Sequence, residues 1–260
     1  HLCGGSAGRE GAALQIGGSI GEALGRLFRL HDTDINIIVI CGMSAVFASL
    51  FGTPIAATVF SMEVISVGVI HYSAFVPCIV SASIAYGIIQ KLHIDASIFP
   101  QIYAPEFTVF LFIKIIFLAM LCGIVSMLFC ISVHGAERLY KKYISNDYQR
   151  IFVGGCLVIA LTMLSGTRAY NGQGADMLQL AMTGTCPTFA FFLKILFTAL
   201  TLGAGFKGGE IVPTLFVGAT LGNVVAPLLG LDATLGAAIG MISLFCSVVK
   251  CPLASVLLSR

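Results

Sequence analysis

The segments Gly8-Arg9-Glu10-Gly11 and Gly208-Gly209-Glu210-Ile211-Val212-Pro213 open two copies of one short module in this chain. Each opening combines glycine with glutamate, and a glycine-containing apolar stretch follows. A module that occurs twice in one chain predicts two structural repeats with related folds.

Later landmarks of the two copies keep nearly the same spacing. The matched residues are Gly17 with Gly218, Gly21 with Gly222, Gly42 with Gly240, and Pro54 with Pro252. The first two pairs are 201 positions apart and the last two are 198 apart, so one loop differs by three residues. In this register Glu10 matches Ile211, and Glu210 lies one place before its strict counterpart. The two glutamates therefore need not have the same role.

The composition is that of an integral membrane protein. Hydrophobic residues make up 58% of the chain and charged residues 10%, and the mean hydropathy is +1.00. Apolar runs cover 35–51, 54–70, 72–90, 107–133, 151–165, 188–205, 211–230 and 235–249. Several approach the ~20 residues that a spanning helix needs. They lack the alternation of barrel strands, so we predict an all-α, multi-pass bundle in the cell membrane.

We interpret residues 1–260 as one incomplete transmembrane domain. Residues 1–136 belong to the first repeat and 151–260 to the second, with a polar break between them. The chain opens at His1 without an initiator Met, and we expect it to be a fragment. The net charge of +2 is small and scattered and gives no reason to expect a nucleic-acid partner. Nine cysteines without a CxxC pair favour packing roles over zinc or disulfides, and we expect no cofactor.

The two openings have the chemistry of an anion site. A helix that begins inside a membrane presents unpaired N–H groups and the positive end of its dipole. Glycine lets an ion approach those amides closely. Two such openings that meet near the bilayer midplane would form one anion path. The alternative is that the glycines only allow tight helix packing.

Three acids are candidates for proton or gating roles. Glu10 would compete with an anion for the same amides, and its protonation would release the site; alternatively it caps a helix or pairs with Arg9. For Glu210, helix capping and an ion or proton role are both open. For Glu63 we favour a buried carboxyl bonded to a neighbouring helix end.

Two lysines lie in apolar runs, and we expect Lys114 and Lys194 to reach an interface or to pair with an acid, without a transport role. An enzyme is not indicated, because the chain has no HExxH and no recognisable spacing of Ser, His and acid.

The motifs resemble the CLC family of anion channels and proton-coupled anion antiporters over most of the chain. Gly8-Arg9-Glu10-Gly11 with Gln15 is similar to that family's GREGxxxQ segment, and Gly208 to Pro213 is similar to its GGxFxP segment. Pro54 and Pro252 resemble its paired proline-led helices. The resemblance implies inverted repeats whose broken helices meet at the midplane, and a homodimer with an anion path in each subunit.

The resemblance also implies residue roles. Glu10 matches the external gating glutamate, and we assign gating or proton transfer to Glu10 and Glu210. The predicted anion-binding residues are Gly8, Arg9, Gly11, Gly208, Gly209, Glu210, Ile211 and Val212. Ile211 stands where many members have Phe. The family's first anion motif and its inner tyrosine would lie before His1 and after Arg260.

The choice of anion depends on two positions in this comparison. Val64 replaces an acid that many proton-coupled chloride members carry, and Glu210 precedes Ile211. Both features resemble the bacterial fluoride/proton branch, although we expect Thr in that branch where this chain has Val212. We therefore predict proton-coupled antiport of fluoride, ahead of chloride. The alternative is a passive voltage-gated-type chloride channel.

Overall fold

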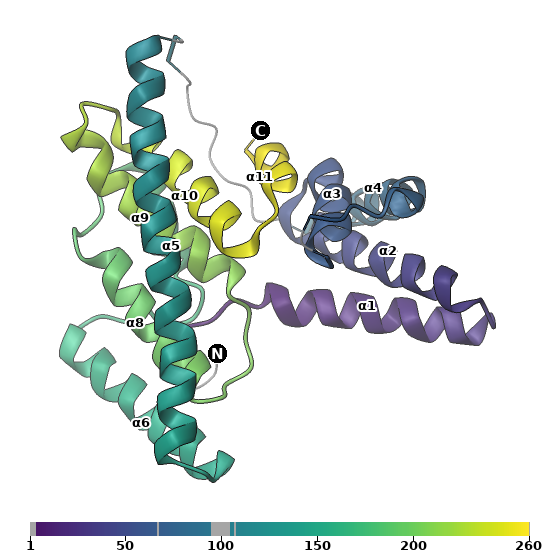
Figure 1. Ribbon diagram of the computed structural model, residues 1–260, viewed down its shortest axis with the longest axis horizontal. Coiled ribbons are helices and arrows are strands. Elements are labelled where there is room, and N and C mark those ends of the chain that lie inside the picture. Colours follow the sequence, from purple (N-terminus) through teal and green to yellow (C-terminus); the bar gives the residue numbers. More distant parts are fainter. Residues whose placement is uncertain (1–3, 67, 95–104, 107, 260) are drawn as a thin grey trace. The chain divides into compact units, whose positions relative to one another are not determined.

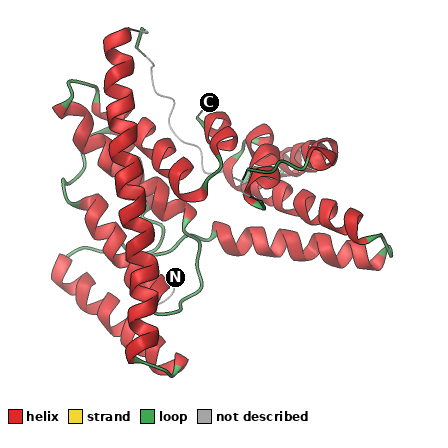
Figure 2. Ribbon diagram, viewed as in Figure 1, coloured by secondary structure: helices red, strands yellow, loops and turns green. Residues whose placement is uncertain are grey.

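The computed structural model describes residues 4–66, 68–94, 105–106 and 108–259. Throughout these residues the regular elements are helices (Figure 2). The helices are α1 (Glu10–Leu27), α2 (Asp32–Phe51), α3 (Pro54–Val64), the 3-10 helix η1 (Tyr72–Ala74), α4 (Phe75–Lys91), α5 (Val109–Tyr143), α6 (Asp147–Ser165), α7 (Ala175–Thr183), α8 (Ala190–Gly203), α9 (Ile211–Leu228), α10 (Ala233–Val249) and α11 (Pro252–Leu258). Each apolar run in the sequence overlaps at least one of these helices, which confirms the all-helical prediction.

The chain forms two compact units. The α5–α10 unit comprises residues 1–9 and 100–248, and the α1–α4 unit comprises residues 10–99 and 249–260. The openings at Gly8 and Gly208 thus belong to the same unit, although they start different sequence repeats. The assignment of the repeats to 1–136 and 151–260 stays a prediction.

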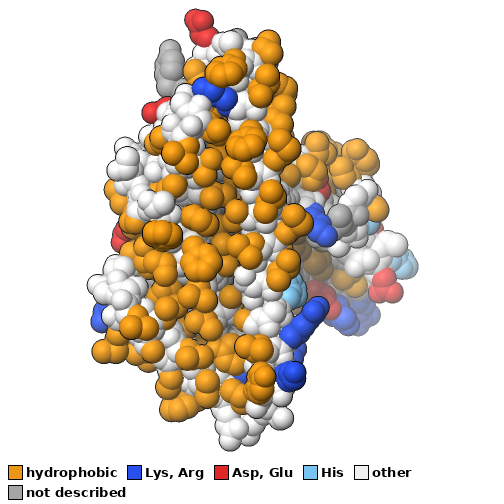
Figure 3. Space-filling view, turned by 60° about the vertical axis from the view of Figure 1, so that its left-hand side comes forward, with side chains coloured by type: hydrophobic (Ala, Val, Ile, Leu, Met, Phe, Trp, Pro, Cys, Tyr) orange, Lys and Arg blue, Asp and Glu red, His pale blue; other side chains and the backbone are white. Residues whose placement is uncertain are grey.

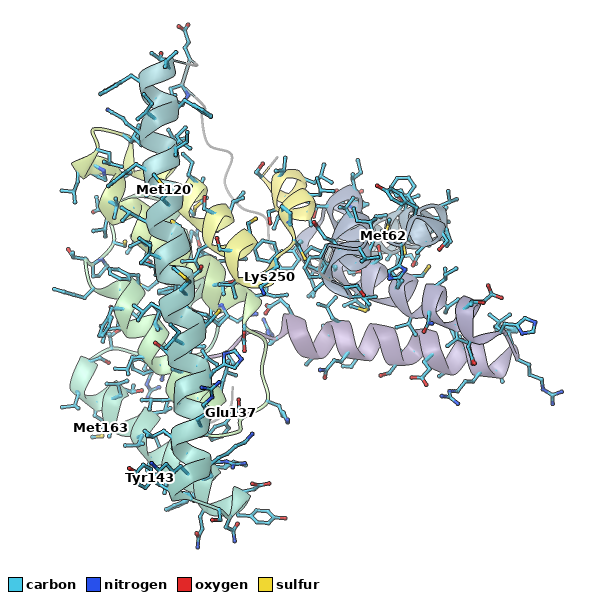
Figure 4. All side chains as sticks on the ribbon, in the orientation of Figure 1. Met62, Met120, Glu137, Tyr143, Met163 and Lys250 are labelled. Atoms are coloured by element: carbon cyan, nitrogen blue, oxygen red, sulfur yellow. The ribbon has the colours of Figure 1, made fainter. Side chains whose placement is uncertain are left out.

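Helix α5 is the longest element of the α5–α10 unit, in which it packs against α8 and α9 (Figure 1). Its 35 residues correspond to about 52 Å at 1.5 Å per residue, which exceeds the ~30 Å hydrocarbon core of a bilayer. The excess is polar: Glu137 and Lys141 form an ion pair of 2.6 Å near the end of α5 at Tyr143 (Figure 4). This end of the helix therefore extends beyond the hydrocarbon layer.

The surface of the same unit suits a lipid environment. Hydrophobic side chains cover most of its face in Figure 3, and Phe110, Ile124 and Ile131 on α5 are more than half exposed. Among the described residues, five helices are long and apolar enough to cross a membrane: residues 32–51, 72–91, 109–143, 147–165 and 211–228. The chain is a multi-pass membrane protein, as the composition predicted.

The repeat landmarks pack in the same way in the two units. In the α1–α4 unit, a Cβ atom on Gly42 would lie 2.1 Å from the carbonyl oxygen of Gly17. In the α5–α10 unit, a Cβ atom on Gly240 would lie 2.3 Å from the carbonyl oxygen of Gly218. Glycine at these positions lets two helix backbones touch where they cross. The residues matched by the sequence register are thus the contact points of α1 with α2 and of α9 with α10.

Each of these helix pairs is followed by a short proline-led helix. Pro54 opens α3 and Pro252 opens α11, each at the first helical position. Proline suits that position because its missing N–H would have no acceptor there and its φ is already helical. The two short helices pack against each other within the α1–α4 unit.

Candidate functional site

The two glycine openings meet through their backbones in the α5–α10 unit. The N–H of Gly8 donates to the carbonyl of Gly209 at 2.8 Å, and the N–H of Gly209 donates to the carbonyl of Gly8 at 2.9 Å. We call this pair the glycine bridge. A Cβ atom on Gly208 would lie only 2.3 Å from the Cβ of Ala7. The approach of the two segments therefore requires glycine at 208.

The glycine bridge lies directly before the start of α9. Glu210 is the N-cap residue, and its carbonyl accepts the N–H of Thr214 at 2.9 Å. Pro213 has no N–H, and the amides of Glu210, Ile211 and Val212 have no acceptor within the helix, as at any helix start. These three amides and the positive end of the α9 dipole can bind an anion.

The position of Glu210 bears on its role. Its side chain is exposed in this unit and makes no capping hydrogen bond to α9. Helix capping, one of the two roles considered for this acid, is therefore not what the carboxylate does here. A proton or ion role for Glu210 stays a prediction.

Arg9 extends the site toward a neighbouring loop. Its guanidinium Nη2 donates to the side-chain oxygen of Gln173 at 3.1 Å. Gln173 belongs to the loop between α6 and α7, shortly before α7 begins at Ala175. Arg9 is exposed in its unit, and its predicted contact with an anion is untested.

Two predicted site residues belong to the α1–α4 unit. Glu10 is the first residue of α1 and is only 4% exposed. Gly11 follows it and is half-buried. A carboxylate in the first turn of a helix interacts favourably with the dipole, so the position suits either a gate or a structural acid.

Glu63 has the structural role that we favoured. Its carboxylate is buried, with Oε1 accepting the N–H of Leu253 at 3.3 Å and Oε2 accepting the N–H of Ala254 at 3.1 Å. Both amides lie in the first turn of α11. The carboxylate thus binds a neighbouring helix start.

The expectation that Lys194 reaches an interface or pairs with an acid was wrong. Lys194 is fully buried, and its Nζ donates to the carbonyls of Tyr170 at 3.0 Å and Gly172 at 2.9 Å. A lysine stem can extend its amine toward water, but this face of α8 is buried and the loop before α7 supplies nearby backbone acceptors. Lys114 donates to the carbonyl of Gly230 at 3.3 Å instead of pairing with an acid.

Sequence reasoning also missed the two threonines that contact the first opening. The N–H of Ser6 donates to Thr201 Oγ1 at 3.0 Å, and the Ser6 and Thr198 hydroxyls are 3.1 Å apart. With Lys194, these residues have the spacing i, i+4, i+7, which places them on one face of α8. Polar residues at this spacing in an apolar run were the sequence signal that could have identified this face of α8.

Comparisons with known proteins identify the family that this chain resembles. The family model described as voltage gated chloride channel matches residues 1–259. A chloride/fluoride channel protein of Pseudomonas syringae pv. tomato is 32% identical over 272 residues, which cover 100% of this chain and 59% of the relative. The H(+)/Cl(-) exchange transporter ClcA of Vibrio cholerae is 30% identical, over 96% of this chain and 57% of the relative.

Solved structures show the same fold. A CLC-type fluoride/proton antiporter superposes with a TM-score of 0.94 at 33% identity, over 98% of this chain and 65% of that protein. A slow cyanobacterial Cl-/H+ antiporter superposes with a TM-score of 0.82 at 21% identity, over 99% of this chain and 63% of that protein. This likeness confirms the CLC-like fold.

The chain spans somewhat more than half the length of the curated relatives that it matches. The match of the family model nevertheless runs almost from end to end. The chain therefore belongs to the voltage-gated chloride channel family.

Proposed function

We propose that the protein to which this chain belongs is a proton-coupled anion antiporter of the cell membrane, and not an enzyme. The observation that carries the proposal is the glycine bridge, which brings the two openings together directly before the amides of Glu210, Ile211 and Val212. The names of a V. cholerae relative and of two solved structures, all exchange transporters or antiporters, support coupling to protons. The transported substrate is a small inorganic anion, and its transport needs no cofactor.

Backbone amides are suitable donors for such an ion. They supply partial positive charge without a mobile cation that would hold the ion too tightly, and the dipole of α9 adds to their field. Gly8 and Gly209 use their N–H groups within the bridge, so their part is to hold the segments together. Gly208 and Gly11 keep side chains away from the openings, and Arg9 adds a charge beside them.

Glu10 is the proposed gate and proton carrier. A carboxylate at a helix start competes with an anion for the same field, and protonation removes that competition. Exchange follows if the anion enters when Glu10 takes up a proton and leaves when Glu10 becomes a carboxylate again.

We propose fluoride ahead of chloride as the substrate. Glu210 before Ile211, and Val64 in place of a second acid after Glu63, are the residues that favour it. The names of the P. syringae relative and of one superposed antiporter both include fluoride. The protein that transports the anion is proposed to be a homodimer in the lipid bilayer. Mass photometry of the purified protein can test this oligomeric state.

The test is flux from liposomes that contain the full-length polypeptide. Fluoride and chloride electrodes report the anion, and a pH-sensitive dye reports protons. We expect an outward anion gradient to drive protons inward, and Glu10→Ala to abolish proton movement while anion flux persists. Glu22→Gln, on the exposed face of the same helix, is the matched control and should keep both fluxes.

The second candidate is a passive channel, which the name of the P. syringae relative favours. In that case wild-type liposomes would release anion without any proton movement, and Glu10→Ala would change only the rate. A protein that moves neither anion would refute both candidates.

A further inference from the structure

The polar face of α8 consists of Lys194, Thr198 and Thr201. All three side chains are at most 1% exposed, although the rest of α8 is almost entirely apolar. Burying an ammonium group is costly unless hydrogen bonds compensate, and Lys is almost never fully buried without a partner. An apolar side chain of similar size would often serve packing better. The presence of a lysine here therefore calls for a role other than packing.

The acceptors of Lys194 are backbone carbonyls of the loop between α6 and α7. Nζ donates to Tyr170 and Gly172, and it also lies 5.0 Å from the centre of the Phe216 ring, a cation–π distance. Hydrogen bonds from a charged donor are stronger than neutral ones. The amine therefore fixes the position of this loop relative to α8 and α9.

The loop in turn holds the first opening. Gly172 uses both of its backbone polar groups: its carbonyl accepts from Lys194 at 2.9 Å, and its N–H donates to the carbonyl of Gly5 at 3.0 Å. The next residue, Ser6, donates its N–H to Oγ1 of Thr201 at 3.0 Å. Gly5 and Ser6, which lead into the first opening, are thus fixed to the loop and to α8.

Thr198 makes a side-chain contact with Ser6, because the two hydroxyl oxygens lie 3.1 Å apart. The segment from Gly4 to Gly8 has no regular secondary structure of its own apart from the bridge. Its position depends on these partners. Gly8, at its end, then forms the glycine bridge to Gly209.

We propose that Lys194, Thr198 and Thr201 are positioning residues for anion transport. Lys194 holds the loop at Gly172, and the loop and the two threonines hold the first opening so that the glycine bridge forms beside the start of α9. The proposal rests on the proposed function, because it assumes that the amides after the bridge bind the anion. The three side chains act through the backbone and do not themselves contact the ion.

The test compares Lys194→Met and Thr201→Val with wild type in the liposome assay described above. Initial rates over a range of fluoride and chloride concentrations separate apparent affinity from maximal rate. Loss of the charged hydrogen bonds in Lys194→Met should weaken the apparent anion affinity about tenfold or more. Thr201→Val keeps the shape of the side chain and removes two neutral bonds, one from the N–H of Ser6 and one to the carbonyl of Phe197 within α8. Loss of the bond to Ser6 should weaken the apparent anion affinity about fivefold. The proton-to-anion ratio should fall in both variants.

Leu196→Met is the matched control. Leu196 lies on the same helix with its side chain partly exposed, and a swap of similar volume is well tolerated. Its affinity and proton-to-anion ratio should equal those of wild type. Ser6→Ala is a milder variant that removes only the contact with Thr198, and it decides the question if Lys194→Met does not fold; it should shift affinity in the same direction.

A merely structural role would give a different pattern. Variants with less folded protein would show a lower maximal rate and an unchanged affinity and proton-to-anion ratio, and that result would overturn the proposal. The proposed function fails separately, if wild-type protein moves no anion at all. If the wild-type protein exchanges anion for protons while Thr201→Val and Ser6→Ala both keep the wild-type anion affinity, only the positioning role is refuted.

Discussion

The contact between Glu63 and the start of α11 allows a sharp prediction about stability. Pro252 at the first position of α11 has no N–H, so the next two amides are the ones without an acceptor in the helix. The two carboxylate oxygens of Glu63 take these amides, at 3.3 Å from Leu253 and 3.1 Å from Ala254. Glu63→Gln keeps the size of the side chain and removes its charge.

The expected cost follows from these two bonds. A hydrogen bond to a charged group contributes about 1.5–3 kcal/mol, against about 1 kcal/mol for a neutral one. Glutamine keeps one oxygen, which can accept one of the amides, but its NH2 group then faces the other N–H. We expect Glu63→Gln to lower the free energy of unfolding by about 2–3 kcal/mol.

Denaturant titration in detergent measures this change, and Glu22→Gln is its control. Glu22 belongs to the same unit and pairs with Arg26 at 2.7 Å, but both side chains are about half exposed or more. Such a surface pair contributes about 0.3–0.5 kcal/mol. If Glu63→Gln cost no more than Glu22→Gln, the carboxylate would not be holding α11, and the reasoning above would be refuted.

Three further predictions concern helix crossings, a helix cap and the glycine bridge. Gly42→Ala would place a Cβ 2.1 Å from a backbone oxygen of Gly17 and should destabilise the protein by about 1–3 kcal/mol or more, whereas Gly123→Ala, with open space around it, should be neutral or stabilising; thermal melting distinguishes the two, and equal melting temperatures would contradict the crossing. Asp232 accepts amides at the start of α10, and hydrogen bonds from a threonine side chain and from the backbone hold its pKa below the usual value. Its lowered pKa means that its contribution is present above the unfolded pKa and is lost as pH falls through the folded pKa, so Asp232→Ala should cost about 1 kcal/mol at neutral pH and progressively less in acid; a cost independent of pH would argue against the cap. Gly208→Ala should reduce anion flux in liposomes because its Cβ would collide with a neighbouring side chain, and wild-type flux would show that the close approach is dispensable.

Helix positions were predictable from the sequence because apolar runs determine them in a membrane. The run at 54–70 shows the limit of that rule, since α3 ends at Val64 and the described residues 65–66 and 68–70 are not helical. Helix α1 produced no apolar run, because glycines occupy the face that crosses α2. It was found only through the repeat register, in which Gly17 and Gly42 match Gly218 and Gly240.

The candidate site was less predictable because its contacts join distant parts of the chain. Periodicity shows which face of α8 is polar. It does not show that the partner of Thr198 is Ser6, which lies 192 residues away in the sequence. Lys194 was misjudged for the same reason, since its acceptors are backbone carbonyls and carry no sequence signal. A charge in an apolar helix is costly to bury, and the structure shows the two hydrogen bonds that offset this cost.

The contact of Glu63 with the start of α11 also bears on the role proposed for Glu10. At α11 a glutamate side chain holds the two first-turn amides that proline leaves, so a tethered carboxylate serves as the anion of a helix start in this protein. At α9 the residue at the N-cap is itself a glutamate, yet its side chain makes no capping bond. A helix start that its own acid does not cap remains suited to another anion, whether a mobile ion or a second carboxylate. Competition between a mobile ion and a carboxylate at one set of amides is the chemistry that the proposed exchange requires.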